Sequence, residues 1–344
     1  MNAFNCIGPA WDRMVATCFR PFRFKVWAQL ALVVLLAGEG IGGSFGSKFP
    51  STVGNGKHSQ LPHLPWSHQQ IVFLVAVGAA ISVVLLLIFT YLNSRARFVL
   101  MESVIERTCR LGEMWRRWRE PADGYFTFTL LVMIVSVSVI AAMGLSAWRN
   151  FRHGSPTVPG IGSFAGLILF AFIFFFMVAL IWLFAKDFVV PIMALERLAL
   201  GDAWSRLRAI VSAQPGAFAL YVLARIVLTM ASGILAFIIA IPLILVIAIP
   251  LGILIAVFAF AAKGSFALMA VGIVLAILVV LPLALVIFGL FNVPFGVFFE
   301  SFALEFLSSR LPSLAAVMHP IPVPPFVPDP APPLMPPPAE PSPI

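Results

Sequence analysis

Long runs of apolar residues, separated by short polar segments, are the main pattern along this chain. A helix needs about 20 apolar residues to cross roughly 30 Å of hydrocarbon, whereas barrel strands show segments of about ten residues with alternating polarity. The runs here are continuous, so the pattern predicts an all-α, polytopic transmembrane helical bundle. The predicted spans are residues 26–45, 71–91, 126–148, 164–185, 218–240 and 266–291.

The tract from Phe218 to Phe291 is longer than two spans require, because only Arg225 and Lys263 interrupt it. Several Pro and Gly residues divide this tract. Residues 241–262 therefore form either a kinked extension of a long helix or an additional or re-entrant span. Hydropathy alone allows seven spans, while the repeat described next favours six.

A short sequence motif containing Trp and Arg precedes three of the apolar runs. It occurs at 10–13, 115–117 and 203–206, and each copy is followed by a Phe that opens the next run. Such a repeat predicts three helical hairpins entered through amphipathic cytosolic helices that lie in the membrane interface. The alternative is that Trp and Arg meet there by composition, since both favour the inner interface. The residues of this predicted interfacial collar are Trp11, Arg13, Trp115, Arg117, Trp204 and Arg206.

Composition and charge agree with a membrane protein. Charged residues make up 10% of the chain and apolar residues 61%, whereas a soluble domain has roughly a quarter of its residues charged. The net charge of +8 does not indicate nucleic acid binding, because the basic residues flank the apolar runs and form no separate basic domain. With the N-terminus inside, sixteen Lys and Arg residues fall on inner segments and five on outer segments. The positive-inside rule therefore predicts a cytosolic N-terminus.

Two segments flank the predicted membrane domain of residues 26–318. Residues 1–25 are expected to form a cytosolic amphipathic segment. Residues 319–344 form a Pro-rich tail, with 13 Pro among the last 25 residues. Such a composition predicts disorder with polyproline II character, serving either as a tether or as a docking peptide for a protein partner. The three Cys residues all fall on the predicted cytosolic side, so no disulfide is expected.

Three ionisable residues are candidate binding residues, because charge is costly at membrane depth. These are Glu39, Asp187 and Arg225. Arg225 has the chemistry to bind an anion or to pair with Glu39 or Asp187. The simpler interpretations are that Glu39 is interfacial, that Arg225 snorkels to the inner surface, and that Lys186 and Asp187 form an exposed ion pair.

No motif for catalysis, nucleotide binding or a metal site occurs in the sequence. His58, His63 and His68 recur every five residues, which places them on no common helix face. We therefore expect no enzyme activity, no metal and no cofactor.

Several short sequence segments resemble those of an uncharacterised family of bacterial multi-spanning membrane proteins. They are Ser94–Phe98, Trp115, Asp187–Met193, Ala203–Trp204, Tyr221, Val293–Pro294 and Phe299–Leu307. More distantly, the pattern is similar to the membrane domain fused to some glycerophosphodiester phosphodiesterases. The resemblance implies the bacterial cytoplasmic membrane and about six helices. It implies no catalytic residue, because the phosphodiesterase barrel is absent.

These observations favour a non-enzymatic scaffold that contacts membrane lipids or a protein partner. A transporter or permease subunit is the alternative, and it predicts that Glu39 and Arg225 face a central cavity. An intramembrane lipid-modifying enzyme is a second alternative.

Overall fold

The computed structural model describes residues 3–39, 68–153, 158–261 and 266–319, and all regular structure within these ranges is helical. The all-α prediction is confirmed. The elements are η1 (Ala3–Cys6), α1 (Ile7–Cys18), α2 (Phe24–Ala37), α3 (His68–Glu106), α4 (Leu111–Arg117), α5 (Arg119–His153), α6 (Val158–Phe184), η2 (Ala185–Val189), α7 (Val190–Glu196), α8 (Leu200–Ala213), α9 (Pro215–Ala261), α10 (Phe266–Ser308) and α11 (Pro312–Met318).

Five stretches of these helices are long and apolar enough to cross a membrane. They are Val72–Glu106, Arg119–Arg149, Ala165–Glu196, Pro215–Pro242 and Pro282–Ser308. The protein is therefore a multi-pass membrane protein.

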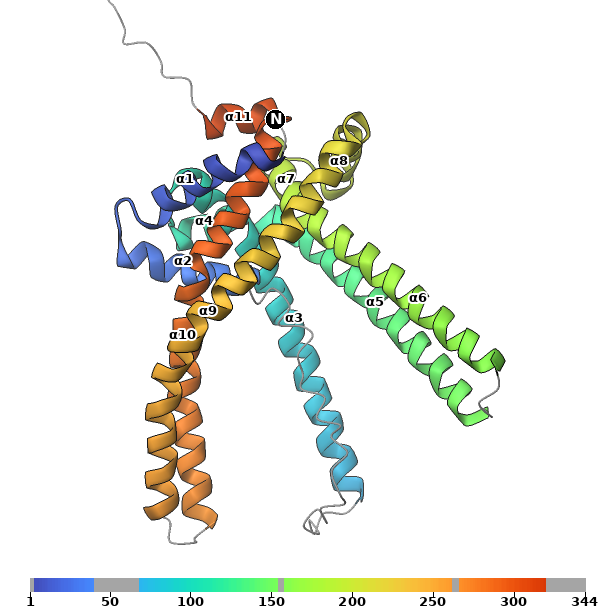
Figure 1. Ribbon diagram of the computed structural model, residues 1–344, viewed down its shortest axis with the longest axis vertical. Helices are drawn as coiled ribbons and strands as arrows, with labels where there is room; N and C mark the ends of the chain where they lie inside the picture. Colours follow the sequence, from blue (N-terminus) through green and yellow to red (C-terminus); the bar gives the residue numbers. More distant parts are fainter. Residues whose placement is uncertain (1–2, 40–67, 154–157, 262–265, 320–344) are drawn as a thin grey trace, which may run out of the picture.

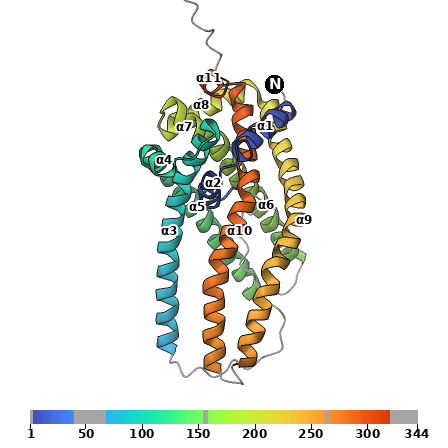
Figure 2. The same ribbon diagram turned by 90° about the vertical axis from the view of Figure 1, so that its left-hand side faces the viewer.

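The short helices gather at one end of the molecule, together with the adjoining ends of the long helices (Figure 1). We call this unit the head; it contains η1, α1, α2, α4, α7, α8 and α11. The long helices leave it as three arms, which are α3, the hairpin of α5 and α6, and the hairpin of α9 and α10 (Figures 1 and 2). The N-terminal helices and α11 both belong to the head, so the two ends of the described chain lie on the same side.

The arms carry apolar side chains that the rest of the chain does not cover. No residue is buried in the most apolar stretch of α3 or of the span Ala165–Glu196. Phe73 on α3 and Phe172 on α6 expose 71% and 69% of their surface. The fully buried residues lie instead in the head and at the bases of the arms, which form the only continuous core among the described residues.

Helix α2 is shorter than the span predicted over residues 26–45. It ends at Ala37, and its 14 residues reach about 21 Å at 1.5 Å per residue. Gly38 stops the helix with a left-handed φ of 65°, its N–H bonds to the Leu35 carbonyl, and the N–H of Glu39 bonds to that of Val34. This pair of bonds is a Schellman motif, which glycine closes at low steric cost.

Helices α9 and α10 are each continuous within the described ranges, so residues 241–261 extend α9 and form no separate span. Pro242 and Pro250 lie inside α9, and Pro282 and Pro294 lie inside α10. Pro is tolerated in membrane helices, because neighbouring groups satisfy the backbone carbonyls that it frees.

Glycine allows α10 to approach α2 closely. A Cβ atom at Gly296 would lie 2.7 Å from Cγ1 of Val34, and one at Gly289 would lie 3.4 Å from the carbonyl oxygen of Ala31. Real Cβ atoms essentially never approach another heavy atom within 3.0 Å. The contact between α2 and α10 therefore depends on the missing side chain at Gly296.

Candidate functional site

A cluster of buried and partly buried charges joins the bases of the three arms. Glu39 follows α2 at its centre, Arg97 lies on α3, Lys186 and Asp187 lie in η2, and Arg225 lies on α9. Nη1 of Arg97 is 2.9 Å from Oε1 of Glu39, and Nζ of Lys186 is 2.9 and 3.0 Å from its two carboxylate oxygens. Nη2 of Arg225 lies 3.8 Å from Oε2 of Glu39. One carboxylate therefore contacts a cation from each arm.

A second carboxylate completes the cluster. Asp187 is 2% exposed, accepts a 2.7 Å hydrogen bond from the hydroxyl of Tyr221, and lies 3.5 Å from Nη2 of Arg225. Nη1 of Arg225 also donates to the carbonyl of Phe299 at 3.3 Å, and its guanidinium stands 4.1 Å from the centre of that ring. The Arg225 side chain is thus held between two carboxylates and an aromatic face.

Asn93 connects the cluster to the end of α2. Its side-chain oxygen accepts from Nε of Arg97 at 3.2 Å, and its side-chain nitrogen donates to the carbonyl of Leu36 at 2.8 Å. The amide therefore satisfies a terminal carbonyl of α2 and orients the guanidinium that binds Glu39.

The element that carries Lys186 and Asp187 is a π-helical turn between α6 and α7. Such turns are rare, and they are frequent at functional sites. Glu300 on α10 lies in the electrostatic field of the same cluster, where it interacts with Glu39, Asp187, Lys186 and Arg97. Within the described part of the chain it makes no ion pair or hydrogen bond. Counted with Glu300, the cluster holds three cations and three carboxylates.

Glu39 lies outside the five long spans, and the three neighbouring cations determine the pKa of its carboxyl group. Burial raises the pKa of this carboxyl, but Lys186, Arg97 and Arg225 together lower it to about 2. Glu39 is therefore ionised at neutral pH, with a side chain only 6% exposed.

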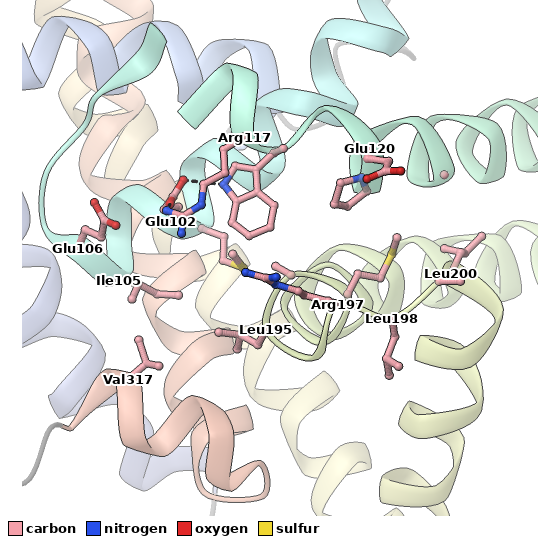
Figure 3. Close-up of a pocket in the computed structure, with 17 residues that line it drawn as sticks. Glu102, Ile105, Glu106, Arg117, Glu120, Leu195, Arg197, Leu198, Leu200 and Val317 are labelled. Atoms are coloured by element: carbon pink, nitrogen blue, oxygen red, sulfur yellow. Dashed lines mark hydrogen bonds and ion pairs between the residues drawn. The ribbon is translucent and has the colours of Figure 1, made fainter. Parts of the chain in front are cut away.

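A separate cavity of about 900 Å³ lies in the head (Figure 3). Its walls come from the end of α3, the chain from α4 into α5, the chain from α7 into α8, and α11. None of Glu39, Asp187 and Arg225 lines it. The lining residues are Met101, Glu102, Ile105, Glu106, Arg117, Trp118, Glu120, Pro121, Gly124, Met193, Ala194, Leu195, Arg197, Leu198, Ala199, Leu200 and Val317.

A family model for a family of unknown function, DUF7544, matches residues 1–317. The chain belongs to DUF7544. No curated protein and no solved structure matches it. The prediction that the chain belongs to an uncharacterised family is confirmed, and the cluster and the cavity both lie within the matched part of this DUF7544 chain.

The structure brings the three candidate residues Glu39, Asp187 and Arg225 of this DUF7544 chain together. It corrects the simpler interpretation of each. Glu39 is buried and paired, so it is not a solvated interfacial residue. Arg225 is 6% exposed and paired with carboxylates, so it does not snorkel to the surface. Asp187 is buried, and Lys186 lies 4.0 Å from it but closer to Glu39, so the two do not form an exposed pair.

The sequence reasoning missed Arg97 and Lys186, which make the shortest contacts to Glu39. In the sequence, Arg97 counts only among the basic residues of the inner segments, and Lys186 is expected to pair with Asp187 rather than with Glu39. Basic residues beside an apolar run indicate topology and ion pairing equally well, so no local signal separated the two roles.

The six collar residues lie on α1, α4 and α8, and each of these short helices directly precedes another helix of this family member. Their environments differ. Trp11 is 56% exposed, whereas Arg13 is buried, pairs with Glu305 at 3.2 Å and donates to the carbonyl of Met318. The collar is thus part surface and part core.

In the second and third copies of the motif, at 115–117 and 203–206, each Arg forms an ion pair with a Glu and each Trp is half-buried. Arg117 pairs with Glu102 at 2.7 Å and Arg206 with Glu196 at 3.5 Å. Trp115 and Trp204 both pack against the core. His58 and His63, and the tail from Pro320, lie outside the described residues.

Proposed function

We propose that the protein is a non-enzymatic scaffold of the bacterial cytoplasmic membrane, with a cytosolic N-terminus, that holds lipids or a membrane protein partner against its arms. One observation carries this proposal: the arms diverge from the head, and their apolar side chains find no partner within the chain (Figure 1). Exposed apolar surface of this extent is matched by lipid tails or by other membrane helices.

The charge cluster supports the same role. A scaffold needs fixed angles between its arms, and Glu39 contacts a cation at the base of each arm. The side on which basic residues gather supports a cytosolic head, because short helices with Arg residues, such as α4 and α8, all belong to it.

Photo-cross-linking from the arms tests the scaffold proposal. A benzophenone side chain would be placed in cells at Val84 on α3, Ile173 on α6 or Ile238 on α9, which are 55%, 51% and 60% exposed. Leu304, which is fully buried on α10, is the control position. We expect adducts with lipid or with another protein from the three arm positions and none from the control. Cross-links from one arm to another within the chain would contradict the proposal, because the arms would then pack on each other.

A transporter is the second candidate, and the buried charges beside a π-helical turn favour it. Proton flux into vesicles, followed with a pH-sensitive dye trapped inside, tests this function in Glu39→Gln and Arg225→Gln. A transporter that uses the cluster loses flux in both variants. Equal flux in the wild type, the variants and protein-free vesicles would rule out proton transport through the cluster.

A further inference from the structure

The cavity in the head has unpaired charges of both signs around apolar walls. Arg197, Glu106 and Glu120 line it, and within the described part of the chain none of these three makes an ion pair or a side-chain hydrogen bond. Glu102 is by contrast occupied, because it accepts from Arg117 at 2.7 Å and from the indole of Trp118. The cavity therefore offers one guanidinium and two carboxylates that are exposed to solvent and engaged by no other side chain among the described residues.

The free charges are arranged on different sides of the space. In Figure 3, Glu106 and Glu120 lie on opposite sides of the cavity, and Arg197 lies between them. Below Arg197 in that view, the wall is made of aliphatic side chains, among them Leu195, Leu198 and Val317. A ligand complementary to this lining has an apolar body with an anionic group and a cationic group at different ends.

The backbone at Arg197 is held in an unusual conformation. Arg197 ends α7 with a φ of 51°, in the left-handed region that Gly or Asn adopts at lower cost. Residues with side chains persist in such conformations mainly where the surrounding structure imposes them, and these positions concentrate at binding sites. Here the conformation turns the chain from α7 into α8 and leaves the guanidinium at the cavity.

The size of the cavity limits the ligand. Small-molecule sites have volumes of roughly 300–1,000 Å³, and about 900 Å³ is near the upper end of that range. A single amino acid fills only a fraction of this space, whereas a peptide of about three residues spans up to roughly 10 Å between its termini. We propose that the cavity binds a short apolar peptide with free termini, its carboxylate on Arg197 and its ammonium group on Glu106 or Glu120. This proposal is independent of the scaffold function.

Calorimetric titration of the full chain in phosphatidylcholine nanodiscs tests the proposal. The probes are trileucine with free termini, N-acetyl-trileucine and trileucine amide. Trileucine is expected to bind at least tenfold more tightly than either capped form, because each cap removes one of the two charges that the cavity pairs. Equal affinity for all three peptides, or no binding of trileucine, would overturn the proposal without any variant.

Two variants assign the charges. Arg197→Gln should weaken trileucine at least tenfold and leave the affinity for trileucine amide unchanged, since that peptide has no carboxylate. The double variant Glu106→Gln/Glu120→Gln should also weaken the binding of trileucine at least tenfold. It should leave the affinity for N-acetyl-trileucine unchanged, since that peptide has no ammonium group. Arg208→Gln, an exposed position on α8 outside the cavity, is the matched control, and melting temperatures verify folding.

An ethanolamine phospholipid also combines an ammonium group, an anionic group and an apolar body. A further experiment must therefore distinguish a bound lipid from a bound peptide. Native mass spectra of the protein purified from cells would show a retained ethanolamine phospholipid if the cavity held lipid. A retained lipid of this kind that is lost in Arg197→Gln would assign the cavity to lipid and overturn the peptide proposal. Unchanged lipid retention in Arg197→Gln, together with the peptide pattern above, would support it.

Discussion

Replacing Glu39 with Gln should loosen the bases of all three arms at once. The substitution keeps the size of the side chain and removes the carboxylate that Lys186 contacts at 2.9 Å, Arg97 at 2.9 Å and Arg225 at 3.8 Å. At an effective dielectric constant of 20, each such pair contributes roughly 4–6 kcal/mol of Coulomb attraction. Desolvation of the ions offsets most of this, so the expected loss is the one for breaking a buried pair, about 3–5 kcal/mol of unfolding free energy.

The matched control for this substitution is Glu113→Gln. Glu113 lies 3.7 Å from Arg110, and both side chains are about 70% exposed. Exposed pairs contribute only about 0–1 kcal/mol, so this variant should unfold like the wild type. The unfolding free energy would be measured in detergent micelles by titration with SDS, with helix content followed by circular dichroism.

A second substitution separates charge balance from general damage. Removing a cation from the cluster of the Glu39→Gln variant, as in Glu39→Gln/Lys186→Met, should restore part of the lost stability, because the single variant leaves three cations around one paired carboxylate. The coupling between the two sites should be at least about 1 kcal/mol. The reasoning is refuted if Glu39→Gln unfolds within about 0.5 kcal/mol of Glu113→Gln, or if the two substitutions are simply additive.

Three further predictions concern titration, thiol reactivity and helix packing. The pKa of Glu39 is about 2 in the folded chain and near 4.5 when unfolded, so its stabilisation is present above about pH 5 and is lost as the pH falls toward 2. The loss, roughly 3 kcal/mol, should appear in acid titrations of the wild type and be absent from Glu39→Gln. All three cysteines are buried, and burial raises the pKa of Cys18 to about 12, so maleimide should label none of them in the native protein at pH 7.5 and all of them in SDS. Gly296→Ala should lower the unfolding free energy by about 1–3 kcal/mol through overpacking against Val34, whereas Gly233→Ala, with open space around it, should be neutral or stabilising.

Hydropathy marks the same segments as the arm helices, because their apolar side chains are largely uncovered by the rest of the described chain. The run from 126 to 148 lies within α5, and the run from 164 to 185 covers most of α6 and the first residue of η2. The first run differs, because α2 ends at Ala37 and one face of it is buried in the core of the head. The buried residues are Leu30, Ala31, Val33, Val34 and Ala37. A core helix and a membrane span have the same composition, and only length and caps separate them. Gly38 followed by Glu39 was the local signal that the helix ends early.

The sequence identified three residues of the charge cluster as candidates, but it did not predict which residues contact one another. Glu39, Asp187 and Arg225 stand out because charge is rare in apolar surroundings. Their meeting depends on how α2, η2 and α9 are placed relative to one another, and the separations in sequence range from 38 to 186 residues. Pattern along the chain carries no information on such distances. The same reason explains why Arg97 was assigned to topology alone, although it closes the cluster from α3.

The pairing of the cluster bears directly on the choice between scaffold and transporter. A transport site must release its ligand, so its charges alternate between ligand and protein partners as the protein changes state. In this structure the carboxylate of Glu39 contacts three cations from three arms, and the cavity in the head is lined by neither Glu39 nor Arg225. An arm that moved away would break the contact between its cation and the Glu39 carboxylate, which is only 6% exposed, and removing partners from a buried carboxylate is destabilising. The cluster therefore opposes independent motion of the arms, and fixed arm angles are what a scaffold requires.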